Sequence, residues 1–87
     1  MTARIRSVGP QVDWVAGQNV RRLRESLGWS RNDLAFQVRL VTGVDLSVAV
    51  IGAMEDPDRD RRITLGEADV LARTFKVPLE ALTREIQ

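Results

Sequence analysis

The chain lacks the side chains that most catalytic and metal-binding sites require. Its 87 residues include no cysteine and no histidine. These absences exclude a disulfide framework, a cysteine- or histidine-ligated zinc site, a cysteine nucleophile and a histidine-based triad. The sequence also holds no paired carboxylates in an apolar setting, no glycine-rich phosphate loop and no cluster of metal ligands. We therefore predict that the chain is not an enzyme and holds no cofactor and no metal.

Long apolar runs are missing as well. None approaches the roughly 18–20 residues that a membrane span needs, and the first residues lack the apolar core of a signal peptide. Hydrophobic residues make up 44% of the chain and charged residues 29%, which is typical of a soluble globular domain. A length of 87 residues fits one domain with a single modest core. We expect a cytoplasmic protein that does not contact a membrane.

Lysine is nearly absent, because 12 of the 13 cationic residues are arginine. Residues 1–31 contain six arginines and two acids, a net charge of +4, whereas the rest of the chain carries seven cations and ten anions, a net charge of −3. Arginine forms forked contacts with phosphate or carboxylate, unlike the point charge of lysine. The uneven distribution favours a basic end that faces a polyanion, although arginine-rich usage also follows from a GC-rich genome.

The chain divides into a short arm and one helical domain. Residues 1–12 show no periodicity and contain a Gly-Pro break, which predicts a flexible basic N-terminal arm. Residues 13–87 form the predicted domain. Asp13 is a plausible N-cap for a first helix that ends at Gly28, and Trp14 is expected in the core. The apolar positions of this helix recur at helical spacing: Ala16, Val20, Leu23 and Leu27.

Three more helices begin with a recognisable capping residue. Ser30 with Asp33, and Thr64 with Glu67, have the spacing of a capping box, and Ser47 caps the helix between them. The expected buried residues of these three helices are Leu34, Ala35, Val38, Ile51, Met54, Ala68, Leu71, Ala72 and Phe75. A fifth helix is predicted from Val77-Pro78 to the end of the chain, with apolar residues Leu79, Leu82 and Ile86. No segment alternates as a strand does, so the fold class is all-α: a single compact domain of five short helices.

The order of these elements resembles a known DNA-binding family. The stretches that carry the resemblance are Val20-Arg21-Arg22-Leu23-Arg24-Glu25, Gly28-Trp29-Ser30, Leu34-Ala35, Ile51, Met54-Glu55, Ile63-Thr64, Glu67, Leu71-Ala72, Val77 and Leu82. Together they cover residues 15–83 and are similar to the phage-repressor type of helix-turn-helix, the Cro-like or XRE family. The resemblance implies a lambda-repressor-like fold and a small repressor-type regulator of transcription, of bacterial or phage kind, that binds double-stranded DNA as a homodimer.

The resemblance also implies roles for particular residues. Arg24 and Glu55 would form a structural ion pair, and the helix at residues 47–56 would enter the major groove. The implied phosphate contacts are polar residues at helix starts and in loops: Arg31, Asn32, Arg39, Thr42, Arg59, Arg61 and Arg62. The implied groove-facing residues are Ser47, Val48, Ala49, Val50, Gly52 and Ala53. From the arm, Arg4 and Arg6 could enter the adjacent minor groove.

The groove-facing residues leave two functions open. Val, Ala and Gly cannot make the bidentate hydrogen bonds that distinguish bases, although they can contact a thymine methyl group. One interpretation is a DNA-binding regulator that holds phosphates through arginine. The other is a degenerate helix-turn-helix whose apolar face at Val48, Ala49, Gly52 and Ala53 binds a protein partner. Leu79 and Ile86 could equally belong to the core or to a dimer interface.

Overall fold

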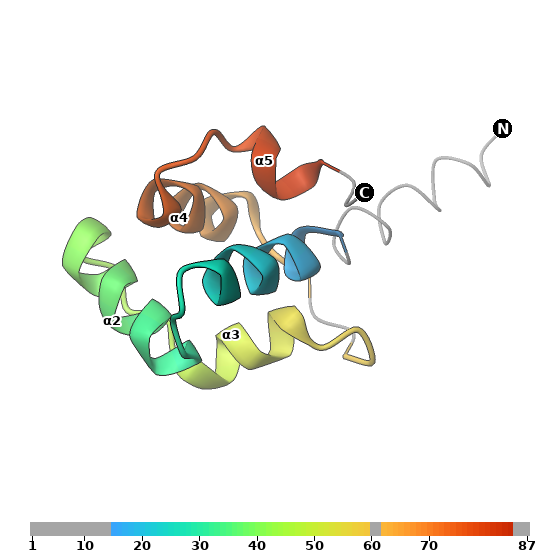
Figure 1. Cartoon of the computed structure of the whole chain (residues 1–87), viewed down its shortest axis with the longest axis horizontal. Helices are drawn as coiled ribbons and strands as arrows, with labels where there is room; N and C mark the ends of the chain where they lie inside the picture. Colours follow the sequence, from blue (N-terminus) through green and yellow to red (C-terminus); the bar gives the residue numbers. More distant parts are fainter. Residues whose placement is uncertain (1–14, 60–61, 85–87) are drawn as a thin grey trace, which may run out of the picture.

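The computed structural model describes residues 15–59 and 62–84, and these residues are helical with connecting turns. The first helix covers residues 15–26 of the described chain and is followed by four labelled helices (Figure 1). These are α2 (Arg31–Thr42), α3 (Val48–Glu55), α4 (Leu65–Phe75) and α5 (Glu80–Thr83). The predicted all-α class is confirmed for this part of the chain, where no strand occurs. The arm at residues 1–12, Asp13, Trp14 and Ile86 lie outside the described residues.

The three predicted capping residues that lie in the described part of the chain all cap their helices. The hydroxyl oxygens of Ser30, Ser47 and Thr64 accept hydrogen bonds from the backbone N–H groups three residues later. Both capping boxes are complete, because the side chains of Asp33 and Glu67 accept from the backbone N–H of their own cap. The starts of α2, α3 and α4 are thus determined by bonds within four consecutive residues.

Two glycines end helices in the left-handed conformation. Gly28, with φ +72°, follows the first helix, and Gly43, with φ +77°, follows α2. The N–H of Trp29 donates to the carbonyl of Arg24 across the first of these turns. Because the chain turns away there, Leu27 is not buried as its spacing predicts, and half of it (50%) is exposed.

One core lies at the centre of the helices. Every described helix contributes to it through the buried residues Val20, Leu34, Val38, Ile51, Leu71 and Leu82. The half-buried ring of Trp29 stacks on Phe75 at a centroid distance of 6.0 Å, which ties the start of α2 to the end of α4. The apolar stripe predicted for α4 (Ala68, Leu71, Ala72 and Phe75) is buried as expected.

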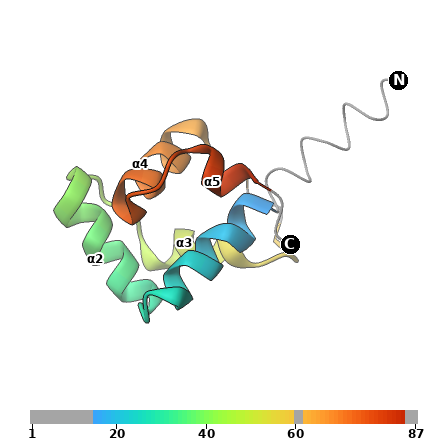
Figure 2. The ribbon, with the colours of Figure 1, turned by 45° about the horizontal axis from the view of Figure 1, so that its top comes forward.

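The fifth helix is shorter than the sequence predicts. Among residues 77–84, only Glu80–Thr83 are helical, after a turn in which the N–H of Ala81 donates to the carbonyl of Pro78. Leu82 is buried, whereas Leu79 remains 37% exposed. In Figure 1 the first helix crosses the middle of the molecule, with α4 and α5 on one side and α3 on the other; Figure 2 shows the same helices from a tilted viewpoint.

Candidate nucleic-acid interface

The first helix holds α3 along one side. Gly17 lies so close to α3 that a Cβ atom at this position would overlap the carbonyl oxygen of Met54. Directly next to that contact, the Gln18 amide donates to the carbonyl of Glu55 at 3.0 Å, which satisfies a backbone acceptor at the end of α3. Ile51, Met54 and Glu55 are buried on this side. We call the side formed by these three residues the inner face of α3.

A buried ion pair connects the same two helices. The Arg24 guanidinium donates from Nε to Oε2 and from Nη2 to Oε1 of Glu55, both at 2.8 Å, and from Nη1 to the carbonyl of Trp29 at 2.8 Å. Glu55 is 1% exposed and Arg24 is 8% exposed. The hydrogen bonds that Arg24 donates to Glu55 raise the pKa of Arg24 above its ordinary value, because they favour the charged guanidinium. The pair that the family resemblance implies is therefore present in the fold.

A second arginine reaches the same carboxylate. Arg31, the first residue of α2, donates from Nε to Oε1 of Glu55 at 3.1 Å. Its side chain remains 45% exposed, in contrast to 10% for Arg24. The family resemblance implies a phosphate contact for Arg31, and the sequence gives no sign of this ion pair, because Arg31 and Glu55 are 24 positions apart and share no local pattern.

The opposite side of α3 carries small residues. Val48 and Ala49 are exposed, and Gly52 and Ala53 are partly exposed. We call the side formed by these four residues the outer face of α3. Val50 does not belong to it, because it packs against the core. The remaining predicted groove residue, Ser47, has its hydroxyl oxygen occupied by the N–H of Val50 at 3.1 Å.

The residues predicted to contact phosphate differ in their exposure and in the bonds that their side chains already make. Arg39 is exposed, and its Nε lies 3.7 Å from an oxygen of the exposed Asp45, a contact that water competes with effectively. The Thr42 hydroxyl donates to the carbonyl of Val38 at 2.7 Å and is thus used inside α2. Asn32, Arg59 and Arg62 are exposed as well. Three predicted residues lie outside the described part of the chain: Arg4, Arg6 and Arg61.

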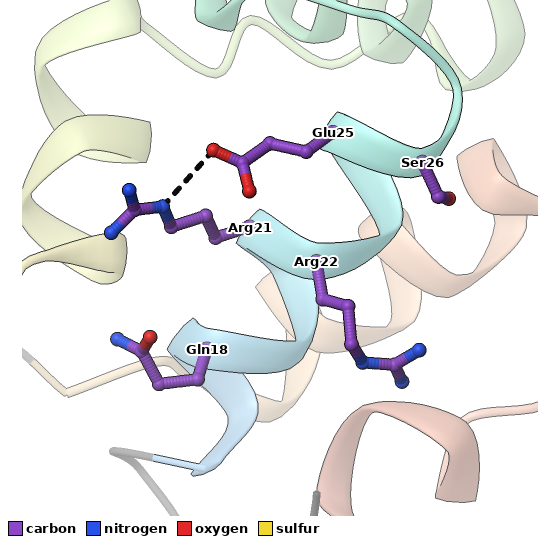
Figure 3. A pocket seen from close by; sticks show the side chains of 5 residues that line it. All are labelled: Gln18, Arg21, Arg22, Glu25 and Ser26. Carbon is purple, nitrogen blue, oxygen red and sulfur yellow. Dashed lines mark hydrogen bonds and ion pairs between the residues drawn. The ribbon is translucent and has the colours of Figure 1, made fainter.

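A shallow depression runs along the exposed side of the first helix (Figure 3). Its lining residues are spaced as one face of a helix: Gln18, Arg21, Arg22, Glu25 and Ser26. Arg21 and Arg22 point to different sides of it, and Arg21 donates to Glu25 at 3.2 Å. An exposed pair four residues apart on a helix contributes little stability. This surface has the character of a solvated helix face.

Asn19 is a structural residue that sequence reasoning missed. Its side chain is fully buried (0% exposed), and its Nδ2 atom donates to the carbonyls of Leu82 and Arg84, each at 2.7 Å. These bonds tie the C-terminal helix to the first helix. No local pattern reveals such a role, because the acceptors are backbone carbonyls more than sixty positions away.

Comparisons with models of protein families, with curated proteins and with solved structures find no match to this chain. Within residues 15–59 and 62–84, no group of three or more metal-ligating side chains is close enough to hold a metal ion. In the same residues, no helix combines the length and apolar character that crossing a bilayer requires.

Proposed function

We propose that this chain is a lambda-repressor-like helix-turn-helix protein that binds double-stranded DNA and regulates transcription. In this proposal the segment 47–56, which contains α3, enters the major groove, and two copies bind half-sites roughly 10 bp apart. The observation that carries the proposal is the asymmetry of α3. Its inner face is fixed by Gly17, Gln18 and Arg24, while its outer face is exposed or partly exposed and carries no bulky side chain.

The small side chains of the outer face suit close approach to base edges. A helix fills much of the width of the major groove, so short side chains bring its backbone nearer to the bases. Ala49 and Val48 supply methyl groups that can pack against the methyl group of thymine. Because these four residues carry no polar side chain, the outer face would select DNA by apolar contact and by shape, and not by hydrogen bonds from its own side chains.

Phosphate contacts would supply most of the affinity. Three exposed polar residues lie where helix-turn-helix proteins meet the DNA backbone. Asn32 is in the first turn of α2, Arg39 is near the end of α2, and Arg59 follows α3. Each phosphate contact releases counterions, so the affinity should fall steeply as the salt concentration rises. A regulator bound in this way acts at a promoter by occluding it or by recruiting another factor.

The proposal is tested by selection from a pool of random double-stranded DNA. The full chain is incubated with the pool at low salt and at about 150 mM salt, where non-specific contacts weaken. We expect an enriched motif that survives the higher salt. Absence of any retained DNA at low salt would overturn the proposal.

A pair of variants with the same change in charge sharpens this test. Ala49→Asp and Arg73→Ala each lower the net charge by one, but Ala49 lies on the outer face and Arg73 lies near the end of α4. Ala49→Asp places a carboxylate in the proposed groove contact, so we expect at least about a tenfold loss of affinity, from like-charge repulsion. Arg73→Ala should bind almost as well as the unchanged chain.

A second candidate function is docking of a protein on the outer face. The observation that favours it is the exposure of apolar side chains where α3 begins, at Val44 (41%) and Val48 (38%). The small residues Ala49 and Gly52 would let a partner helix approach closely. This candidate requires a stable protein complex that Ala49→Asp abolishes and Arg73→Ala preserves, together with no retention of DNA at low salt.

A further inference from the structure

An arginine from another helix lies against the outer face of α3. At Gly52, where α3 has no side chain, the guanidinium of Arg31 lies within van der Waals distance of the Cβ position. An added Cβ atom at position 52 would lie 3.4 Å from Nη1 and 3.8 Å from Cζ of Arg31. The polar group that α3 itself lacks therefore comes from the first residue of α2.

Among the described residues, the Arg31 guanidinium is hydrogen-bonded through its Nε atom alone. Arg31 Nε donates to Glu55 Oε1 at 3.1 Å, which fixes the group beside Gly52. Among the described residues, its two terminal nitrogens donate no hydrogen bond, and the side chain is 45% exposed. The edge formed by Nη1 and Nη2 is thus available for a ligand.

The carboxylate that positions Arg31 does not cancel its charge. Glu55 already accepts two hydrogen bonds from Arg24, one on each oxygen, at 2.8 Å. Two cations and one anion leave the cluster with a net charge of +1. Because Arg24 is buried, the exposed part of this positive charge is at Arg31.

We propose that Arg31 is the base-contacting residue of this domain and donates from Nη1 and Nη2 to N7 and O6 of a guanine in the major groove. A pair of parallel donors matches guanine in the major groove better than any other base. This inference rests on the proposed DNA binding and assigns Arg31 to a base edge rather than to phosphate. Glu55 acts as a positioning residue, because it orients the guanidinium through Nε and has its other oxygen bound to Arg24.

The test compares binding to the selected site and to sites altered at one guanine. In one altered site the guanine–cytosine pair is replaced by adenine–thymine; in another the guanine is replaced by 7-deazaguanine, which lacks the N7 acceptor. We expect the unchanged chain to lose about 5- to 150-fold in affinity on the first replacement, the discrimination typical of one bidentate pair. A smaller loss should follow the removal of N7 alone.

Three variants separate base contact from phosphate contact. Arg31→Lys keeps the charge but not the fork, so it should bind random DNA within about twofold of the unchanged chain and lose the guanine preference. Arg31→Ala should lose the same preference, whereas Arg73→Ala should keep it. If Arg31→Ala instead weakens binding equally at all sites, with a salt dependence reduced by about one phosphate, the inference is overturned while DNA binding stands. If the unchanged chain retains no DNA, the proposed function itself has failed.

Substitution of Gly52 tests whether the position of the Arg31 guanidinium beside α3 matters, while Arg31 itself is unchanged. Gly52→Gln adds a long side chain next to the guanidinium, whose Nη1 would lie 3.4 Å from the new Cβ atom, so we expect Arg31 to be displaced and the guanine preference to be lost with Arg31 still present. Gly52→Ala meets Arg31 only at ordinary contact distance and should retain the preference. Thermal unfolding confirms that each variant is folded before its binding is compared. A guanine preference that persists in folded Gly52→Gln would contradict the inference.

Discussion

The two faces of α3 differ in what their residues contact and in what a substitution should change. The inner face holds Ile51, Met54 and Glu55, all buried against the first helix and the core. The outer face holds residues with side chains of at most three carbon atoms, and its largest residue, Val48, is 38% exposed. In the proposed function, this eight-residue helix keeps the residues for folding and those for recognition on separate sides. Substitutions on the inner face should change stability, and those on the outer face should change binding.

Glu55→Ala should cause the largest loss in the free energy of unfolding. It leaves Arg24 buried without a counterion, and removal of one partner from a buried pair costs about 3–5 kcal/mol. Unfolding in urea, followed by circular dichroism, measures this loss. Glu25→Ala is the matched control, because it removes an exposed carboxylate from Arg21 and should cost less than about 1 kcal/mol. Equal losses in the two variants would refute the assignment of a structural role to the buried pair.

Gly17→Ala should cause the second-largest loss of stability. The added methyl group overlaps the carbonyl oxygen of Met54, so α3 has to move away from the first helix. Overpacking of this kind costs about 1–3 kcal/mol or more. Gly66→Ala in α4 is the same substitution in open space, with nothing closer than 3.9 Å, and should stabilise the fold by up to about 1 kcal/mol. Opposite shifts in melting temperature are expected, and a stabilised Gly17→Ala would contradict the close approach.

Ser47→Ala should have a moderate effect at the boundary between the two faces. It removes the hydroxyl that accepts from the N–H of Val50, and the loss of an N-cap costs about 0.5–2 kcal/mol. Ser47→Asp restores a capping oxygen, so its stability should match that of the unchanged chain. Its added negative charge should still weaken DNA binding. Equal melting temperatures for the Ala and Asp variants would rule out a capping contribution.

Arg31→Ala should have the smallest effect on stability, although it contacts the same carboxylate as Arg24. Arg31 is half-exposed, so solvent screens its ion pair, and Glu55 keeps both bonds to Arg24. We expect a loss below about 1 kcal/mol, against about 3–5 kcal/mol for Arg24→Ala. Chemical denaturation of both variants measures the difference. A loss for Arg31→Ala as large as that for Arg24→Ala would mean that Arg31 is part of the scaffold.

The sequence predicts best what depends on neighbouring residues. The caps at Ser30, Ser47 and Thr64 are formed within three positions along the chain, so their spacing is sufficient to identify them. The spacing of apolar residues was less reliable at helix ends. Leu27 has the right periodicity for burial, but the helix already ends at Ser26 and the chain turns away from the core. The length of α5 was overestimated in the same way.

The candidate site was only partly visible in the sequence. The small residues of the outer face are evident from helical periodicity, and Arg24 with Glu55 followed from a resemblance to known proteins rather than from spacing. Arg31 was assigned to phosphate, whereas its guanidinium lies over Gly52 and binds Glu55. Gly52 was the one sign of this contact in the sequence, because a residue without a side chain leaves room for a side chain from another helix. The sequence does not indicate which side chain occupies that room.

The sequence by itself determined where α2, α3 and α4 begin, most of the residues that are buried in them and how the charges are distributed, because hydrogen bonds at caps and the helical period are local. The tertiary structure alone decided that Gly17 brings the first helix against α3, that Asn19 binds the C-terminal carbonyls and that two arginines share Glu55. These contacts join residues 24 to 65 positions apart, and only the packing of helices around one core brings them within hydrogen-bond distance.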